Sequence, residues 1–206
     1  MRLGLLGPAD DDLDGLAKAA SFLLNDAKVE RAIYLGADDG LEDTVEAWAE
    51  ALVVGDPSDD AVWSRAACVA VSGTPAEIDL FLRNERARQR LRALEGIPPD
   101  GVSAEMFGDR VALLIYDKAQ LDEEDIFSAT FLIYGKSPEP LVKQIGSRWF
   151  LSPGKIGSPG GGSLVLDDDD DEVIATFYGA GGVISRTKKL PTARGARMRV
   201  QGQGDS

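Results

Sequence analysis

Short apolar runs alternate along the chain with longer segments in which apolar residues recur every three or four positions. The run at residues 3–6 ends at Gly7-Pro8, and the run at residues 31–35 ends at Gly36. Each run is followed by a segment with the spacing typical of a helix that buries one face. Strands that alternate with helices in this way predict parallel βαβ units, whose strand carboxyl ends meet at one edge of the sheet.

The same pattern predicts two more strands in the first half, at residues 51–54 and 67–72, and a long helix from Pro75 to about residue 94. Beyond Pro191 the apolar periodicity disappears. We therefore expect one α/β domain over residues 1–190 and a mobile basic tail over residues 191–206. The strands expected in the second half cover residues 110–116, 130–134, 141–145, 149–151, 163–166 and 173–178.

Ligand-binding groups of parallel sheets usually lie on the loops beyond the strand carboxyl ends. This rule singles out residues 7–12, 36–40 and 55–60, which carry several aspartates. Residues 10–15 copy the start of a calcium-binding loop, but the twelfth position of that loop is Ser21 instead of a glutamate. The aspartates are explained equally well as the N-cap and acidic first turn of a helix.

Two glycine-rich segments lack the features of nucleotide-binding loops. Residues 157–163 contain no Gly-Lys-Ser/Thr sequence and precede no helix, and residues 179–182 lead into another extended segment. We expect a hairpin turn at residues 179–182. The acidic run at residues 167–172 is expected to be a solvated hairpin tip.

The composition excludes several kinds of chemistry. The 206 residues include no histidine and one cysteine, Cys68, which rules out Ser-His-Asp and Cys-His catalysis, intramolecular disulfides and multi-cysteine metal sites. The formal net charge is −13, and so acidic a surface disfavours nucleic acid and anionic lipid. No segment has the pattern of a membrane span or a signal peptide, so a cytoplasmic protein is expected.

The helix expected from Pro75 carries five arginines in its second half and two apolar stripes. One stripe is enough to pack a helix onto a domain, so two stripes beside a basic run predict a surface that another molecule covers. Cations near a helix carboxyl end also suit the helix dipole, so an ordinary core helix with a solvated basic face is the alternative. Because aromatic and arginine residues are favoured at interface centres, the expected anchors are Phe81, Arg83, Arg86 and Arg90.

The glycine loops, together with later Gly-Pro segments, resemble the motifs of the calcineurin-like metallophosphoesterases. In the small single-domain phosphodiesterases of that family the first strand ends in Asp-x-His-Gly, where this chain has Pro8 and Asp10. The second strand ends in Leu-Gly-Asp, here with Ala37 at the last position, and Gly-Asn-x-Asp is matched by residues 55–58, which include Asp56. The resemblance covers about residues 1–180, with an insertion around residues 62–105 that holds the arginine helix.

The later motifs complete this resemblance. A strand that ends in His-Gly in the family is followed here by Tyr116, and Tyr-Gly-His-Thr-His-x-Pro is matched by residues 134–140, with Lys136 and Pro138 at the imidazole positions. The family's Asn-Pro-Gly-Ser-like turn corresponds to residues 152–155. The resemblance implies a four-layer α-β-β-α sandwich, in which two mixed sheets lie face to face between helices.

Catalysis in the family uses two divalent metals held by carboxylates and imidazoles. The matching positions here carry mostly side chains that do not bind such metals, so we expect no catalytic residue, no metal and no cofactor. The Lys136 ammonium is expected to compensate the charges of the carboxylates around it, namely Asp10, Asp56 and Asp38. The vestigial pocket would consist of Pro8, Asp10, Ala37, Asp38, Asp56, Tyr116, Lys136 and Pro138.

The leading prediction is a catalytically inactive adaptor or regulatory scaffold that binds another protein, and the retromer's small subunit is a precedent for this use of the fold. The arginine helix is the first candidate surface, and the acidic rim of the pocket is the second. The alternative is a divergent phosphodiesterase that holds one hard cation through Asp10, Asp38 and Asp56. Nucleic-acid binding through the arginine helix and the basic tail is a third hypothesis, which the net charge disfavours. The oligomeric state is left open.

Overall fold

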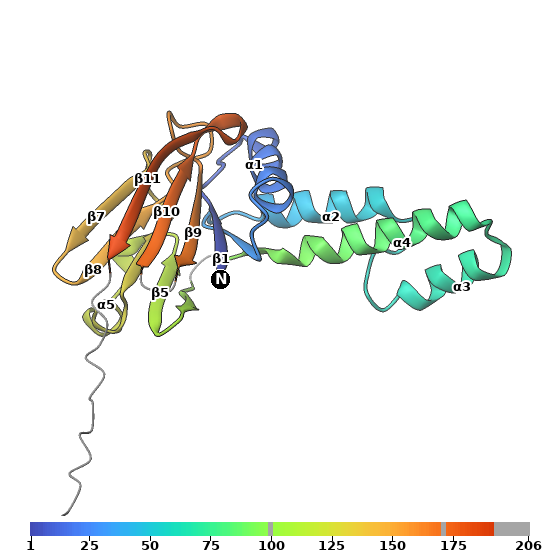
Figure 1. Ribbon diagram of the computed structural model, residues 1–206, viewed down its shortest axis with the longest axis horizontal. Coiled ribbons are helices and arrows are strands. Elements are labelled where there is room, and N and C mark those ends of the chain that lie inside the picture. The colour runs from blue at the N-terminus through green and yellow to red at the C-terminus, as the bar shows by residue number, and fades with distance from the viewer. Residues whose placement is uncertain (99–100, 170–171, 192–206) are drawn as a thin grey trace, which may run out of the picture.

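The computed structural model describes residues 1–98, 101–169 and 172–191 (Figure 1). Its α-helices are α1 (Leu13–Asn25), α2 (Gly40–Leu52), α3 (Val62–Ser72), α4 (Pro75–Arg90) and α5 (Glu123–Ser128). Its strands are β1 (Arg2–Leu6), β2 (Arg31–Tyr34), β3 (Leu94–Gly96), β4 (Ser103–Phe107), β5 (Arg110–Ile115), β6 (Phe131–Tyr134), β7 (Leu141–Ile145), β8 (Arg148–Ser152), β9 (Ser163–Asp169), β10 (Glu172–Tyr178) and β11 (Ile184–Pro191). Short 3₁₀ turns lie at Leu91–Ala93, Lys118–Gln120 and Ala180–Gly182.

The strands form two mixed sheets. The first has the order β11-β10-β9-β1-β2-β3 and the second has the order β4-β5-β6-β8-β7. In the first sheet β1, β2 and β3 are parallel and β9 joins β1 antiparallel. In the second sheet β5, β6 and β8 are parallel, and the edge strands β4 and β7 are antiparallel to their neighbours.

Apolar side chains fill the space between the two sheets. Phe107, Phe131 and Phe177 are almost completely buried there, together with leucines and isoleucines from both sheets. A second apolar cluster joins the outer face of the first sheet to α1 and α2, and a smaller third cluster joins the second sheet to α5. These layers form the α-β-β-α sandwich that the resemblance implied.

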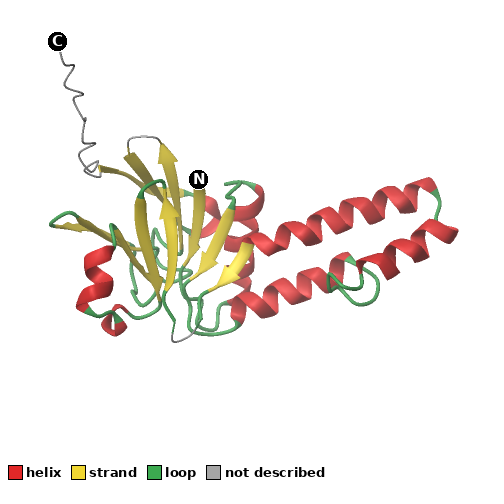
Figure 2. Ribbon diagram, turned by 90° about the horizontal axis from the view of Figure 1, so that it is seen from below, coloured by secondary structure: helices red, strands yellow, loops and turns green. Residues whose placement is uncertain are grey.

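Two helices leave this sandwich and carry a third at their far end. α2 and α4 project side by side, and α3 lies at the end farthest from the sheets (Figures 1 and 2). We call residues 40–93 the hairpin and residues 53–90 the distal hairpin. The expected helix start at Pro75 is confirmed, because Thr74 caps α4 and Glu77 completes a capping box.

Two of the expected strands are wrong. α2 continues to Leu52, so residues 51–54 form no strand, and residues 67–72 lie within α3. Short apolar runs occur in helices and strands alike, and the alanine and glutamate residues of α2 are strong helix formers that extend it through the run. The other expected strands are confirmed, whereas β3, β4 and β11 are additional. β3 has only three residues, too few to show an alternating pattern.

Several local expectations have clear outcomes. Asp12 caps α1 by accepting a hydrogen bond from the Gly15 N–H at 2.9 Å, and residues 179–182 form the turn between the antiparallel strands β10 and β11. The insertion at residues 62–105 stays a prediction, although β3 and β4 within that range belong to the sheets. Residues 167–169 and 172 of the expected acidic tip lie in β9 and β10 and not in a turn, whereas residues 170–171 of that tip and residues 192–206 of the expected tail lie outside the described residues. None of the described helices combines the length and apolarity needed to cross a bilayer.

Candidate functional site

Strands of both sheets end close together at one end of the sandwich. The backbone at Gly7, after β1, lies so near Gly154, after β8, that a side chain at Gly7 would overlap the Gly154 carbonyl oxygen. Gly135, after β6, lies in the same way against the carbonyl oxygen of Leu35, after β2. Only glycine permits such close backbone approach. These contacts bring together most of the loops that carry the predicted pocket.

Asp10 and Asp38 lie on two of these loops, and each has its own partner. Asp10 forms an exposed ion pair with Lys155, with 2.5 Å between Nζ and Oδ2. Asp38 accepts a hydrogen bond from the Tyr34 hydroxyl at 2.9 Å, and that hydroxyl accepts one from the Ala9 N–H at 3.1 Å. Burial raises the pKa of Tyr34, which keeps the hydroxyl protonated as a donor. Tyr34 therefore links the loop after β1 to the loop after β2.

The expectation that Lys136 lies among Asp10, Asp38 and Asp56 is wrong. Its ammonium pairs with Asp117 at 2.5 Å and is mostly exposed. The reason is the sheet order: β6 lies beside β5, so the residue after β6 meets the residue after β5. The hydrogen bond from Lys136 lowers the pKa of Asp117, and the same bond raises the pKa of Lys136.

Four other members of the predicted pocket lie on strand-end loops but carry no carboxylate or imidazole. Pro8 is buried, and its carbonyl oxygen accepts a hydrogen bond from the Ile156 N–H at 2.9 Å. Tyr116 is half-buried against the core between the sheets. Ala37 and Pro138 are exposed. These loops therefore offer a mostly apolar surface at the positions where the family places metal ligands.

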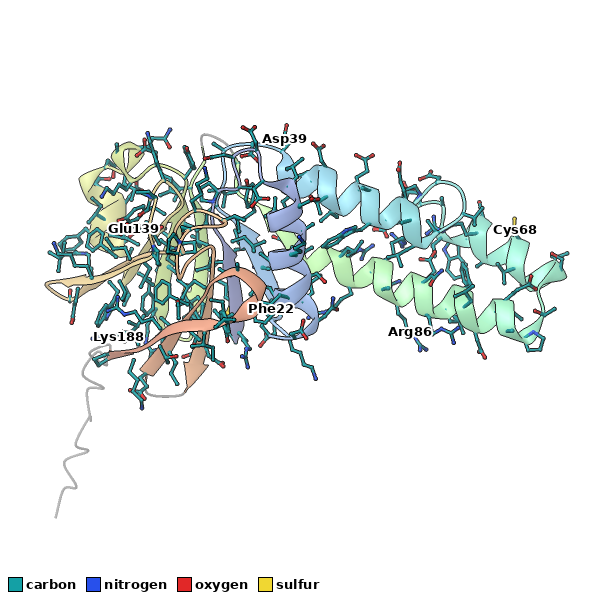
Figure 3. All side chains as sticks on the ribbon, turned by 90° about the horizontal axis from the view of Figure 1, so that it is seen from above. Phe22, Asp39, Cys68, Arg86, Glu139 and Lys188 are labelled. Carbon is teal, nitrogen blue, oxygen red and sulfur yellow. The ribbon has the colours of Figure 1, made fainter. Side chains whose placement is uncertain are left out.

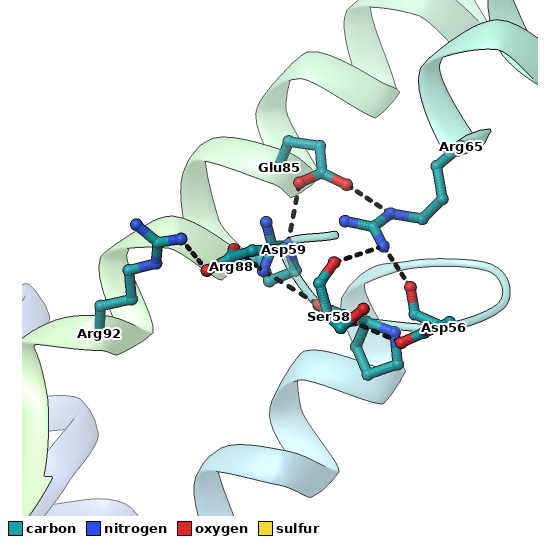
Figure 4. Close-up of polar contacts among 8 residues, drawn as sticks. Asp56, Ser58, Asp59, Arg65, Glu85, Arg88 and Arg92 are labelled. Atoms are coloured by element: carbon teal, nitrogen blue, oxygen red, sulfur yellow. Dashed lines mark hydrogen bonds and ion pairs between the residues drawn. The ribbon is translucent and has the colours of Figure 1, made fainter. Parts of the chain in front are cut away.

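Asp56 does not belong to this group of loops. It lies in the loop between α2 and α3, within the distal hairpin (Figure 4). The third parallel strand of the first sheet is β3, which ends at Gly96, far along the chain from residues 55–58. The match to residues 55–58 depended on the strand at residues 51–54, which does not form.

The carboxylates of the predicted pocket do not form the metal centre that the resemblance implies. Within residues 1–98, 101–169 and 172–191, no three Asp, Glu or Cys side chains lie together as a cation site requires. Asp10 pairs with a lysine, Asp38 with a tyrosine, and Asp56 lies in the hairpin. The described residues therefore do not fit a two-metal centre or an oxygen-only single-cation site.

The distal hairpin contains a buried charged network in place of an apolar core (Figure 4). Only three residues of this segment are buried, namely Arg65 of α3 and Glu85 and Arg88 of α4. The Glu85 carboxylate accepts hydrogen bonds from Arg65 Nε at 2.7 Å and from Arg88 Nε at 2.9 Å. Burial alone would raise the pKa of Glu85, but the hydrogen bonds from the two arginines outweigh it and lower the pKa. Glu85 thus connects α3 to α4 as a carboxylate.

The same arginines hold the loop between α2 and α3. Arg65 donates to two backbone carbonyl oxygens of this loop, and Arg88 donates to a third at 2.9 Å. The Asp59 carboxylate accepts from Arg88 at 2.8 Å and also pairs with Arg92. These hydrogen bonds lower the pKa of Asp59. Two of the five arginines predicted to form a basic face are therefore used within the hairpin.

The predicted anchors lie on two different faces of α4. Phe81 is half-buried beside α3, whereas Arg83 and Arg86 are exposed, and Arg86 points away from α2 (Figure 3). Residues two apart on a helix differ by about 200° in direction, so Phe81 and Arg83 cannot share a face. Neither Arg83 nor Arg86 has an ion-pair or hydrogen-bond partner in the described part of the chain. Arg90 is exposed as well, but it donates to the Val29 carbonyl oxygen at 2.5 Å and so fixes α4 to the sandwich.

An apolar groove of about 620 Å³ lies between α3, α4 and the loop that follows α2. Phe81 and Leu80 of α4 and Cys68 and Val69 of α3 contribute to its lining. The groove adjoins the charged network, since Arg65 also lines it. It does not include Arg83 or Arg86.

A smaller hollow of about 240 Å³ lies beside α1. Its lining combines Asp12, which caps α1, and Lys18 and Phe22 of α1 with both glycine-rich segments. The segments that lacked nucleotide-binding features thus meet at one place. Their glycines leave room there for the α1 side chains.

Sequence reasoning missed the residues that organise the hairpin, although one signal was present. Arg65 is the only charged residue between residues 61 and 72. A single charge within an apolar segment is usually buried against a partner, because an unpaired buried charge is costly. The partner, Glu85, lies 20 residues away and has no comparable signal. Asp117 also carried no signal beyond its position after an expected strand.

Comparisons with known proteins agree with the architecture. No protein-family model and no curated protein sequence matches the chain. Among solved structures, Vps29 from Chaetomium thermophilum superposes with a TM-score of 0.53 at 12% identity, over 93% of this chain and 99% of that one. A predicted phosphoesterase from Streptococcus pneumoniae gives 0.52 at 13% identity, over 93% and 98%, and an archaeal phosphodiesterase gives 0.50 at 15%, over 92% and 100%. At these identities the likeness concerns the fold alone, and this chain has the fold of the calcineurin-like metallophosphoesterases.

Proposed function

We propose that this chain is a non-catalytic adaptor that binds an acidic surface of another protein through the outward face of α4. The observation that carries the proposal is the pair Arg83 and Arg86. Both are exposed on a hairpin that projects from the sandwich, and neither has a partner among the described residues. In a chain with a net charge of −13, carboxylates are abundant, so two free arginines one turn apart are available for an external partner.

The strand-end loops support the non-catalytic part of the proposal. Their carboxylates are engaged with Lys155, Tyr34 and Lys136, and the positions of the family's other ligands carry proline, alanine or tyrosine. The fold does not decide between a non-catalytic adaptor and a phosphodiesterase, because Vps29 and phosphodiesterases share it. The engaged carboxylates of the strand-end loops and the exposed arginines of the hairpin favour the non-catalytic use.

The binding proposal is tested with matched charge reversals. Tagged wild type, Arg83→Glu/Arg86→Glu and the control Lys143→Glu/Lys188→Glu are used to capture proteins from a lysate, and the bound proteins are quantified by mass spectrometry. Lys143 and Lys188 are exposed on the sandwich, so the control makes the same change in net charge away from α4. We expect specific partners to be lost with the arginine variant and kept with the lysine variant. Equal capture by all three proteins would contradict the proposal.

The non-catalytic part needs a separate measurement. We expect hydrolysis of bis(p-nitrophenyl) phosphate with added Mn²⁺ to stay at the rate seen without protein. We also expect millimolar Mn²⁺ or Mg²⁺ to leave the melting temperature unchanged, because ligand binding to the folded state alone would raise it. Metal-dependent turnover or a clear rise in melting temperature would contradict this part.

A further inference from the structure

α3 is apolar except on the side that carries Ser64, Arg65 and Ser72. Its sequence contains one charged residue, Arg65, which is buried in the network with Glu85. The apolar side of a helix is normally covered by another element. One side of α3 faces α4 and the groove, but the opposite side faces solvent at the end of the hairpin.

The solvent-facing side is a continuous apolar stripe. Trp63, Ala67, Ala70 and Val71 lie at the spacing i, i+4, i+7 and i+8, which places them on one face of the helix. Trp63 is 81% exposed and Val71 is 87% exposed, and both alanines are exposed. We call these four residues the α3 outer stripe. It carries no charge, so a matching surface must itself be apolar and uncharged.

The order of Trp63, Ala67 and Val71 along the stripe is self-complementary. Ala67 is four residues from Trp63 and four residues from Val71. In an antiparallel pair of α3 helices centred on Ala67, each Trp63 therefore faces the Val71 of the other copy. The small alanines at the centre allow close approach of the helices, and the large tryptophans fill the two ends. Such reciprocal contacts are those of a two-fold symmetric interface.

The charge distribution permits this contact despite the acidity of the chain. Residues 53–90 contain five arginines and six carboxylates, so the distal hairpin contributes only −1 to the net charge of −13. The excess negative charge lies elsewhere, largely on the sandwich, and α3 lies at the end of the hairpin farthest from it (Figure 2). An antiparallel contact between two α3 helices keeps the acidic sandwiches at opposite ends of the assembly, where salt screens their repulsion.

We propose that the α3 outer stripe is the interface of a two-fold symmetric homodimer, in which the α3 helices of two copies pack antiparallel about Ala67. An 11-residue helix is about 16 Å long. The contact is therefore smaller than the interfaces of about 1,200–2,000 Å² that hold stable complexes. The dimer is therefore weak and dissociates at low protein concentration. Its surface is separate from Arg83 and Arg86, so its failure leaves the proposed adaptor function untouched, and the reverse also holds.

Sedimentation equilibrium over a wide concentration range tests the dimer. We expect wild type to approach twice the monomer mass as concentration rises, and Trp63→Glu to weaken dimerisation at least tenfold. The matched control is Phe127→Glu, because Phe127 of α5 is also 81% exposed but lies on the sandwich; this variant should dimerise as wild type does. A wild type that stays monomeric at all concentrations would overturn the proposal, as would equal weakening by both variants.

Disulfide trapping tests the register. In a Cys68→Ser background, Ala67→Cys places two thiols next to each other at the two-fold axis, and mild oxidation should produce a covalent dimer rapidly. Ala87→Cys in the same background is the control, since Ala87 is exposed on α4 outside the stripe. Trapping at both positions with equal speed would overturn the assigned register.

If wild type is monomeric but binds neutral phosphatidylcholine vesicles through Trp63, the occupant of the stripe is a lipid surface and the proposal is wrong.

Discussion

The sandwich and the distal hairpin are held together by different interactions. Between the sheets, the buried residues are apolar, and aromatic side chains such as Phe107, Phe131 and Phe177 are almost completely removed from water. In the distal hairpin the only buried residues are Arg65, Glu85 and Arg88. Apolar burial is insensitive to pH and cumulative over many contacts. A buried ion network depends on every one of its members.

This difference indicates that the hairpin can open while the sandwich stays folded. The distal hairpin contains no buried apolar residue, and segments with few buried apolar contacts are those that unfold locally. Its exposed apolar residues, including Trp63, Val71, Leu80 and Leu82, are available for contacts with other molecules. The sandwich is thus held together by apolar packing, whereas the order of the distal hairpin depends on its ion pairs.

The largest expected effect comes from the apolar core of the sandwich. Phe131→Ala removes a ring that is fully buried between the sheets and contacts Phe107 edge-on at 6.1 Å between centroids. We expect it to lower the free energy of unfolding by about 3–5 kcal/mol, because a cavity is left behind. Urea denaturation followed by circular dichroism measures this. Phe127→Ala, the same change at an exposed position, should have little effect, and equal losses would contradict the assignment of the core.

Removal of the Glu85 carboxylate should affect the hairpin alone. Glu85→Ala leaves the guanidinium groups of Arg65 and Arg88 without their shared partner. We expect the hairpin to lose about 3 kcal/mol of local stability, the lower end of the range for breaking a buried pair, because solvent surrounds the thin hairpin. Hydrogen exchange should show faster exchange in α3 and α4 and unchanged exchange in β1, β5 and β6. Glu50→Ala, an exposed change on α2, is the control. Equal acceleration throughout the sheets would show that the hairpin and sandwich unfold together.

The sandwich could be predicted from sequence better than the hairpin, and the reason is physical. Glycines at the strand ends, as at Gly7 and Gly36, and short apolar runs are local signals, so most strands could be predicted, whereas the four-layer arrangement was implied by the resemblance of the loop motifs. The pair of Arg65 and Glu85 joins residues 20 positions apart, and charges on a helix usually indicate a solvated face. A second ambiguity led to the wrong position for Asp56. The apolar run at residues 51–54 fits a helix or a strand equally well, and the expected strand would have placed Asp56 among the strand ends.

Acid should loosen the hairpin before it loosens the sandwich. The pKa of Glu85 lies below its ordinary value of 4.5, and the pKa of Asp59 lies below 3.8, since arginines hydrogen-bond both carboxylates. A carboxylate whose pKa is lowered by folding stabilises the folded state. This stabilisation is fully present above the ordinary pKa of the carboxylate, and it is lost as the pH falls through the lowered pKa of the folded state. Exchange protection of α3 and α4, corrected for intrinsic rates, should therefore fall relative to the sheets as the pH drops from 5 towards 3. Glu85→Gln should remove most of this pH-dependent loss of protection in α3 and α4. If the loss is unchanged in Glu85→Gln, other carboxylates cause it.

The smallest effect is expected at the strand ends, where Lys136→Ala tests whether charge matters to the sandwich as it does to the hairpin. Lys136 is exposed and pairs with Asp117 alone, and exposed ion pairs contribute little because water already solvates both charges. We expect the melting temperature to change little, and no more than in Lys155→Ala, which removes the equivalent exposed pair with Asp10. A large fall specific to Lys136→Ala would mean that the lysine neutralises several carboxylates at once. The strand-end loops would then resemble the hairpin, and the contrast between the two regions would no longer hold.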